Sequence, residues 1–88
     1  MFEWDEEKRQ INLAKHKLDF VDVWLLFDGR KCFTSISEYS FEVHSITTFV
    51  DKNKFYTVIW TWREDRHRII SFRRAQHGEE RAYRQIHG

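Results

Sequence analysis

The stretch FYTVIWTWREDRHRIISFRR, residues 55–74, predicts a β-hairpin around which the fold is built. Two runs rich in β-branched and aromatic residues flank the polar pair Glu64 and Asp65, a pattern typical of two strands joined by a short turn. Side chains alternate along a strand, so the first run is expected to hold Tyr56, Val58, Trp60 and Trp62 on one face and Phe55, Thr57, Ile59, Thr61 and Arg63 on the other.

The same alternation, applied to the second run, divides its arginines. One face is expected to hold Ile69, Ser71 and Arg73, and the other Arg68, Ile70, Phe72 and Arg74. On this expectation the arginines do not form one continuous clamp for a phosphate group. The face that the helices leave open is then the one that matters for function.

The rest of the chain adds strands and helices to this hairpin. Strand-like runs at 31–37 and 41–50 extend it to a four-stranded antiparallel meander, and residues 2–4 have the composition of a short edge strand. N-cap signals at Asp5 and Asp19 predict a helix over 6–16 and a shorter one within 18–29, and a last helix begins near Gln76. The expected fold is one α+β domain over residues 1–88, with two N-terminal helices and one C-terminal helix.

Each helix is expected to pack on the sheet through its apolar positions. Ile11 and Ala14 share a face of the first helix, and Ala82 and Ile86 share a face of the last. The stripe of the second helix consists of Phe20, Val23, Trp24 and Phe27. The alternative is that Phe20 and Trp24 line a binding groove.

The composition argues against several kinds of site. Cys32 is the only cysteine, so neither an intramolecular disulfide nor a cysteine-based zinc site can form. The five histidines are scattered without metal-ligand spacing, and neither a glycine-rich phosphate loop nor a GxSxG motif is present. We therefore expect no metal and no cofactor. No apolar run is long enough to span a membrane, and the expected location is the reducing cytoplasm.

Arginine is concentrated in the last third of the chain. Residues 63–84 contain seven arginines, no lysine and four acidic residues, although the formal net charge of the whole chain is only +1. The guanidinium group can donate two parallel hydrogen bonds to a phosphate. The alternative is that these arginines form ordinary surface ion pairs with Glu64, Asp65, Glu79 and Glu80.

Arg, His, Glu, Thr and Tyr side chains on a small sheet suit proton transfer and charge stabilisation without a metal. When RNA is cleaved by its own 2′-hydroxyl, the protein needs to supply a base for the 2′-proton, cations for the crowded phosphate and an acid for the leaving 5′-oxygen. The composition permits this chemistry but does not establish it.

Two motifs at opposite ends of the chain resemble the BrnT family of bacterial toxins. FEWDEEKRQINLAKHKLDF is similar to the family's opening pattern at Phe2, Trp4, Asp5, Lys8, Asn12, Lys15, His16 and Phe20. RHRIISFRRA is similar to its R-I-I-S-A-R-x-A signature at Arg68, Ile69, Ile70, Ser71, Arg73 and Ala75, and a downstream E-x-x-x-Y is matched by Glu79 and Tyr83. The resemblance covers nearly the whole chain.

The resemblance implies a RelE-like fold and a metal-independent ribonuclease that inhibits translation. It also implies a BrnA-like ribbon-helix-helix antitoxin that neutralises the toxin in an oligomeric complex. That complex would repress its own promoter, and the toxin would reach DNA only through the antitoxin.

The chain departs from the family pattern at three positions. Trp62 stands where many relatives carry Glu, His44 stands where Arg is commoner, and Phe72 replaces the Ala of the signature. These changes bear on catalytic strength and substrate choice more than on the fold.

The residues expected to act in catalysis are Arg63, Arg68, Arg73, His44 and Glu42. Arg73 is the first choice for the phosphate, with an ion pair to Glu79 or Glu80 as the structural alternative. Arg63 and Arg68 are expected to converge from paired strands, His44 to transfer protons and Glu42 to orient His44. The expected RNA-binding residues are Lys15, His16, Arg74 and Tyr83. The structural alternatives are that His16 caps the carbonyls at the end of its helix and that Tyr83 packs on the sheet.

Two other functions stay open on the sequence alone. Trp62 favours a non-catalytic relative that acts only as the partner of a DNA-binding antitoxin. General RNA binding is the other, and it predicts strongly salt-dependent affinity for unrelated RNAs.

Overall fold

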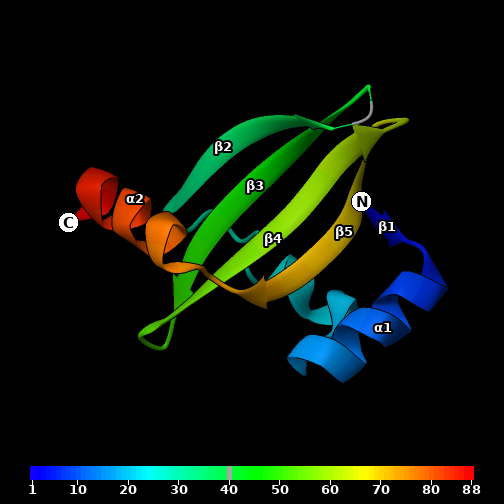
Figure 1. Ribbon diagram of the computed structural model, residues 1–88, viewed down its shortest axis with the longest axis horizontal. Coiled ribbons are helices and arrows are strands. Elements are labelled where there is room, and N and C mark those ends of the chain that lie inside the picture. Colours follow the sequence, from blue (N-terminus) through cyan, green and yellow to red (C-terminus); the bar gives the residue numbers. More distant parts are fainter. Residues whose placement is uncertain (40) are drawn as a thin grey trace.

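The computed structural model describes residues 1–39 and 41–88, and it contains one five-stranded sheet with helices at both ends of the chain (Figure 1). The elements are β1 Phe2–Trp4, α1 Glu6–His16, the 3₁₀ helix η1 Phe20–Leu25, β2 Cys32–Tyr39, β3 Glu42–Asp51, β4 Lys54–Arg63, β5 Arg66–Arg74 and α2 His77–His87. The strand order is β1-β5-β4-β3-β2. The α+β class and the antiparallel order of the last four strands are confirmed.

The sheet has one strand more than the expected antiparallel four. β1 pairs with β5 in parallel, with Phe2 opposite His67 and Trp4 opposite Ile69. The short edge strand expected at residues 2–4 is therefore present, and it makes the sheet mixed. Its pairing covers only the first half of β5.

The second helix is a 3₁₀ helix, which changes the residues that it buries. Asp19 caps it, since its carboxylate accepts a hydrogen bond from the Val21 N–H at 3.1 Å. A 3₁₀ helix has three residues per turn, so its inner face consists of Phe20, Val23 and the following Leu26, which are all buried. Trp24 is 60% exposed, and the expectation that it packs in the core was wrong.

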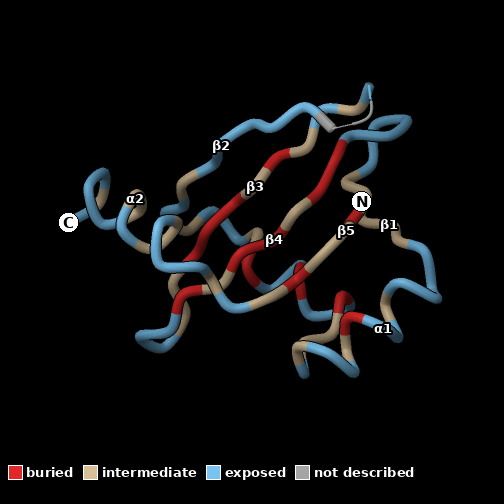
Figure 2. Tube along the Cα trace, in the orientation of Figure 1, coloured by how far each residue is buried: buried red, intermediate tan, exposed pale blue. Residues whose placement is uncertain are grey.

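The core lies on one face of the sheet, between the strands and η1 (Figure 2). Its buried members are Phe20, Val23, Leu26, Phe49, Val58, Trp60, Ile69 and Phe72. Helix α2 lies against the opposite face, where the Phe55 and Tyr83 rings meet at a centroid distance of 5.4 Å. Ile86 of α2 is 63% exposed, so the expectation that it packs was wrong.

A bulge in β5 changes which of its arginines share a face. Ser71 is opposite Ile59 and Ile69 is opposite Trp60, so Ile70 has no partner in β4. The extra residue puts Ile69 and Phe72 on the same, buried face, because the alternation restarts after a bulge. The grouping expected from strict alternation was therefore wrong: Arg68 and Arg73 share the face that points away from the core.

Asn12 joins α1 to the part of β5 that β1 leaves unpaired. Its amide nitrogen donates to the carbonyl oxygens of Phe72 at 2.8 Å and Leu18 at 3.0 Å, and its amide oxygen accepts from the Phe72 N–H at 3.2 Å. The side chain thus replaces a neighbouring strand for one residue of β5. The expectation that helix α1 packs through Ile11 and Ala14 was wrong, because Ile11 is 60% exposed and Ala14 is also exposed.

Arg73 and Glu79 join α2 to the sheet. The guanidinium donates two hydrogen bonds to the carboxylate, at 2.8 and 2.9 Å. Glu79 also accepts from the Gln76 N–H at 2.8 Å and the Thr57 hydroxyl at 2.9 Å. Burial alone would raise the pKa of Glu79, but these hydrogen bonds outweigh it and hold the pKa below its ordinary value.

We predict that Asn12→Ala destabilises the fold by about 2–4 kcal/mol, because it leaves buried backbone groups of Phe72 and Leu18 without partners. Helix propensity alone would predict a gain, since Ala is the better helix former. Urea unfolding measures the difference. Gln10→Ala, on the exposed side of the same helix, is the control and should change stability by less than about 0.5 kcal/mol. A loss below 1 kcal/mol for Asn12→Ala, on the order of one ordinary hydrogen bond, would contradict the role given to this amide.

We predict that Glu79→Gln lowers stability by about 2 kcal/mol at pH 7, because a charge-assisted pair is lost. A carboxylate with a depressed pKa contributes stability that is fully present above its ordinary value of 4.5 and is lost as the pH falls through its folded-state pKa. The difference between wild type and variant should therefore shrink as the pH falls below 4.5. Urea unfolding across this range tests the prediction, with the more exposed Glu80→Gln as control. A difference that does not change with pH would contradict it.

Candidate active site

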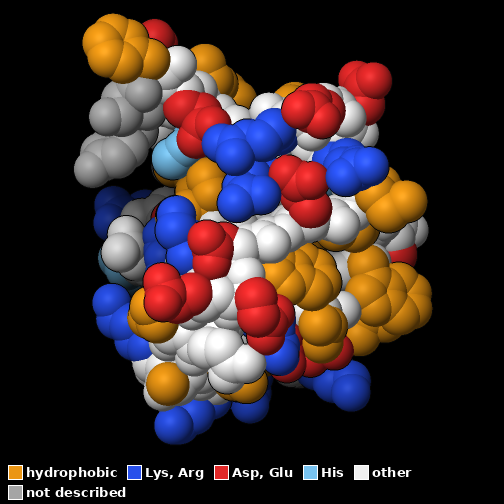
Figure 3. All heavy atoms as spheres, turned by 90° about the vertical axis from the view of Figure 1, so that its right-hand side faces the viewer, with side chains coloured by type: hydrophobic (Ala, Val, Ile, Leu, Met, Phe, Trp, Pro, Cys, Tyr) orange, Lys and Arg blue, Asp and Glu red, His pale blue; other side chains and the backbone are white. Residues whose placement is uncertain are grey.

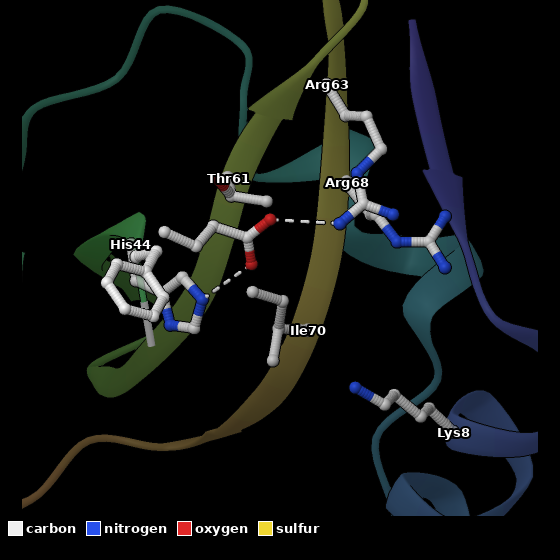
Figure 4. A pocket seen from close by; sticks show the side chains of 8 residues that line it. Lys8, His44, Thr61, Arg63, Arg68 and Ile70 are labelled. Atoms are coloured by element: carbon white, nitrogen blue, oxygen red, sulfur yellow. Dashed lines mark hydrogen bonds and ion pairs between the residues drawn. The ribbon is translucent and has the colours of Figure 1, made fainter. Parts of the chain in front are cut away.

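A pocket of about 450 Å³ lies at the end of the sheet where β3 begins and β4 leads into β5 (Figure 4). Its lining residues come from α1, the β2–β3 turn and strands β3, β4 and β5: Lys8, Phe41, Glu42, His44, Thr61, Arg63, Arg68 and Ile70. Four of the five expected catalytic residues are therefore brought together in one place.

Strand pairing explains this convergence. Arg68 of β5 is opposite Thr61 of β4, on the face that points away from the core. The buried Thr61 hydroxyl donates to the Val43 carbonyl at 2.8 Å and joins β4 to the start of β3. In Figure 4 the guanidinium groups of Arg63 and Arg68 lie near each other, and Lys8 extends from α1 toward the pocket.

Glu42 connects the histidine and one arginine of the pocket. One carboxylate oxygen lies 3.0 Å from His44 Nε2, and the other accepts from Arg63 at 2.9 Å. These hydrogen bonds, with that from Arg63 the stronger, lower the pKa of Glu42, so the group is ionised near neutral pH. Glu42 and His44, which lie on one strand face, are thus joined by a hydrogen bond.

Arg68 also has a carboxylate partner. It donates to Glu3 of β1 at 3.1 Å, and Arg66 reaches the same carboxylate at 3.5 Å. Basic and acidic side chains accordingly alternate on this side of the molecule and do not form one continuous positive surface (Figure 3). A phosphate group that enters the pocket would displace these carboxylates from the arginines or bind the arginines together with them.

A groove of about 190 Å³ continues the pocket along α1. It shares Lys8 and Ile70 with the pocket and adds Lys15 and His16, two of the expected RNA-binding residues. Burial, followed by the nearby charges of Lys15 and Arg73, lowers the pKa of His16. The imidazole is therefore neutral at pH 7, and the cations of this groove are lysines.

Three expected site residues lie outside the pocket and the groove. Arg73 is engaged by Glu79 and is only 16% exposed, which is the structural alternative considered for it. Arg74 lies over the Tyr56 ring at 5.4 Å and donates to the Phe55 carbonyl. Tyr83 packs against Phe55, which is its structural alternative.

The pocket also contains residues that the sequence did not single out as site residues. Lys8 is part of the N-terminal family motif, so the sequence contained a signal that could have marked it as a site residue. Ile70 enters the lining through the bulge, and Phe41 lies beside Glu42 in the turn before β3. No sequence signal marked Phe41.

Trp62 lies on the other side of the sheet from the pocket. It is opposite His67, and the two rings are in contact near Trp60, tilted by 44° at a centroid distance of 4.3 Å. A carboxylate at position 62 would therefore leave β4 on the face away from His44. The carboxylate of the pocket comes from Glu42 instead.

The described residues include no group of three His, Cys, Asp or Glu side chains placed to hold a metal ion. Across the same residues, no helix has the length and apolar character needed to cross a membrane.

A comparison with curated proteins gives no match. A family model does match: it describes the ribonuclease toxin BrnT of type II toxin–antitoxin systems, and the match extends over residues 4–79. This range contains α1, strands β2 to β5 and every residue that lines the pocket. The chain therefore belongs to the BrnT family of ribonuclease toxins.

Proposed function

We propose that this protein is the toxin of a type II toxin–antitoxin pair, an endoribonuclease that works without a metal and inhibits translation. The observation that supports it most is the cluster in which Glu42 holds His44 and Arg63 beside Arg68, in a chain of the BrnT family. The mixed sheet with its flanking helices is compatible with a RelE-like fold, which is part of the same proposal.

In the proposed reaction the 2′-hydroxyl of the RNA attacks the adjacent phosphorus, and the bond from phosphorus to the 5′-oxygen breaks. His44, whose Nε2 lies 3.0 Å from a carboxylate oxygen of Glu42, acts as the base that accepts the 2′-proton. Arg63 and Arg68 donate to the phosphate oxygens as negative charge increases there. Protonated Lys8 supplies the proton to the leaving 5′-oxygen. The products are a 2′,3′-cyclic phosphate and a 5′-hydroxyl.

The groove along α1 would hold the rest of the RNA strand. Lys15 offers charge to a neighbouring phosphate, and neutral His16 offers hydrogen bonds or a surface for a base. This assigns Lys15 and His16 to binding, whereas Arg73, Arg74 and Tyr83 hold the fold together.

The partner proposed with this function is a BrnA-like ribbon-helix-helix antitoxin that neutralises the toxin in an oligomeric complex in the cytoplasm. Family membership supports an antitoxin partner and an RNA substrate. The antitoxin would make the contacts to DNA in that complex.

We predict that Arg68→Ala lowers kcat/KM for RNA cleavage by about 10²–10³-fold, because it removes a donor to the phosphate in the transition state. Arg66→Ala is the matched control, since Arg66 pairs with the same Glu3 but does not line the pocket. It should lose less than about threefold, the equivalent of a surface ion pair. Equal losses in the two variants would show that the shared carboxylate, and not the phosphate, explains the effect.

We predict that the purified protein cleaves RNA in EDTA and that His44→Ala lowers the rate by about 10²–10⁴-fold. Expression of the wild type should arrest growth, and expression of His44→Ala should not. Folded wild-type protein that leaves RNA and translation intact would overturn the enzyme proposal. A non-catalytic relative that acts only as the partner of a DNA-binding antitoxin would then be the better account.

A further inference from the structure

We infer that Phe41 is a stacking residue that holds a nucleobase beside the scissile phosphate and so determines which RNA is cleaved. The inference rests on the proposed function and adds to it a contact with the base. It depends on three independent observations: the exposure of Phe41, its backbone conformation and its place at the pocket.

Phe41 gains almost nothing from the folded core. Its relative exposure is 111%, more than any other large apolar residue described as exposed. Burying a phenylalanine side chain is worth roughly 1.5–3 kcal/mol, so a fully exposed one gives up a contribution that the fold could have used. Stability therefore does not explain a large ring at this position.

The backbone of Phe41 also disfavours a bulky residue. Its φ of 68° lies in the left-handed region, which glycine and asparagine adopt readily and larger L-residues do not. The other non-glycine residues described with positive φ are all polar: Lys17, Lys52, Asn53, Glu64 and Asp65. A strained backbone at an exposed aromatic residue is typical of functional sites.

The position of Phe41 points to RNA as its ligand. It lines the pocket with Lys8, Arg63 and Arg68 and directly precedes Glu42. Cations for the backbone beside an aromatic ring for a base are the combination with which proteins bind single-stranded nucleic acid. Apolar neighbours for a protein partner are few: the pocket lining adds only the aliphatic side chain of Ile70, and Val43, the nearest exposed apolar residue along β3, points to the other face of the sheet.

The test uses a short unstructured RNA in which the wild type has one mapped cleavage site. A chimeric oligonucleotide then carries a single ribonucleotide at that site among 2′-O-methyl residues, and companion oligonucleotides lack the base on one side or the other. Phe41→Gly should lower kcat/KM about 5- to 100-fold on the complete substrate, because stacking on one base is lost. Phe41→Tyr, which keeps the ring, should retain the wild-type rate.

Removal of the stacked base should cost the wild type the same factor and cost Phe41→Gly nothing further. The melting temperature of Phe41→Gly should equal or exceed that of the wild type, since glycine suits the positive φ. Cleavage by Phe41→Gly at the wild-type rate would overturn the inference. It would also be overturned if Phe41→Gly and removal of a base lowered the rate independently of each other, whichever side of the cleavage site the base was removed from. Normal cleavage with weaker binding of the co-expressed antitoxin would assign Phe41 to the protein partner instead.

Failure of the stacking role can be distinguished from failure of the proposed ribonuclease function. If the wild type does not cleave RNA, the fully 2′-O-methylated oligonucleotide still measures binding. Equal affinity of wild type, Phe41→Gly and Phe41→Tyr for it would then overturn the stacking role as well.

Discussion

The amide of Asn12 is the contact on which the rest of the arrangement depends. β1 reaches only the first half of β5, and the Asn12 side chain supplies donor and acceptor to Phe72 just beyond it. This fixes α1 against the edge of the sheet, and with it Lys8 and Lys15 along the groove. Without such a partner, the edge of β5 at Phe72 and the Leu18 carbonyl that follows α1 would have unpaired backbone groups.

The arginines of the C-terminal third have different roles, which their residue type alone does not distinguish. Arg73 is held between strand and helix by Glu79, and Arg74 lies on a tyrosine ring, whereas Arg63 and Arg68 lie in the pocket. Ion pairs inside the fold and the proposed ligands for a phosphate thus come from one short hairpin. The bulge at Ile70 makes this possible, because it keeps Arg68 on the pocket face while Ile69 and Phe72 both enter the core.

Local patterns predicted the hairpin, the first and last helices and the pairing of Glu42 with His44, because alternation and capping act over a few residues. They did not predict the bulge, whose effect depends on the register between β4 and β5. The 3₁₀ form of Phe20–Leu25 depends on packing against the sheet. The apolar stripe of this segment also fits an α-helix, and for that reason the sequence wrongly predicted that Trp24 is buried. No local pattern marked the exposure of Phe41 or its positive φ, because neither is typical of a phenylalanine.

In the free protein the carboxylates of Glu3 and Glu42 form ion pairs with Arg68 and Arg63, the two arginines of the pocket. They are internal competitors for any polyanion, so simple attraction between opposite charges is largely cancelled before RNA arrives. A ligand gains affinity only if its geometry offers the arginines more than the two carboxylates already do. On the proposed function, this pairing would keep a chain with a net charge of +1 from binding nucleic acid indiscriminately, and selectivity would be a property of its ligand-free state.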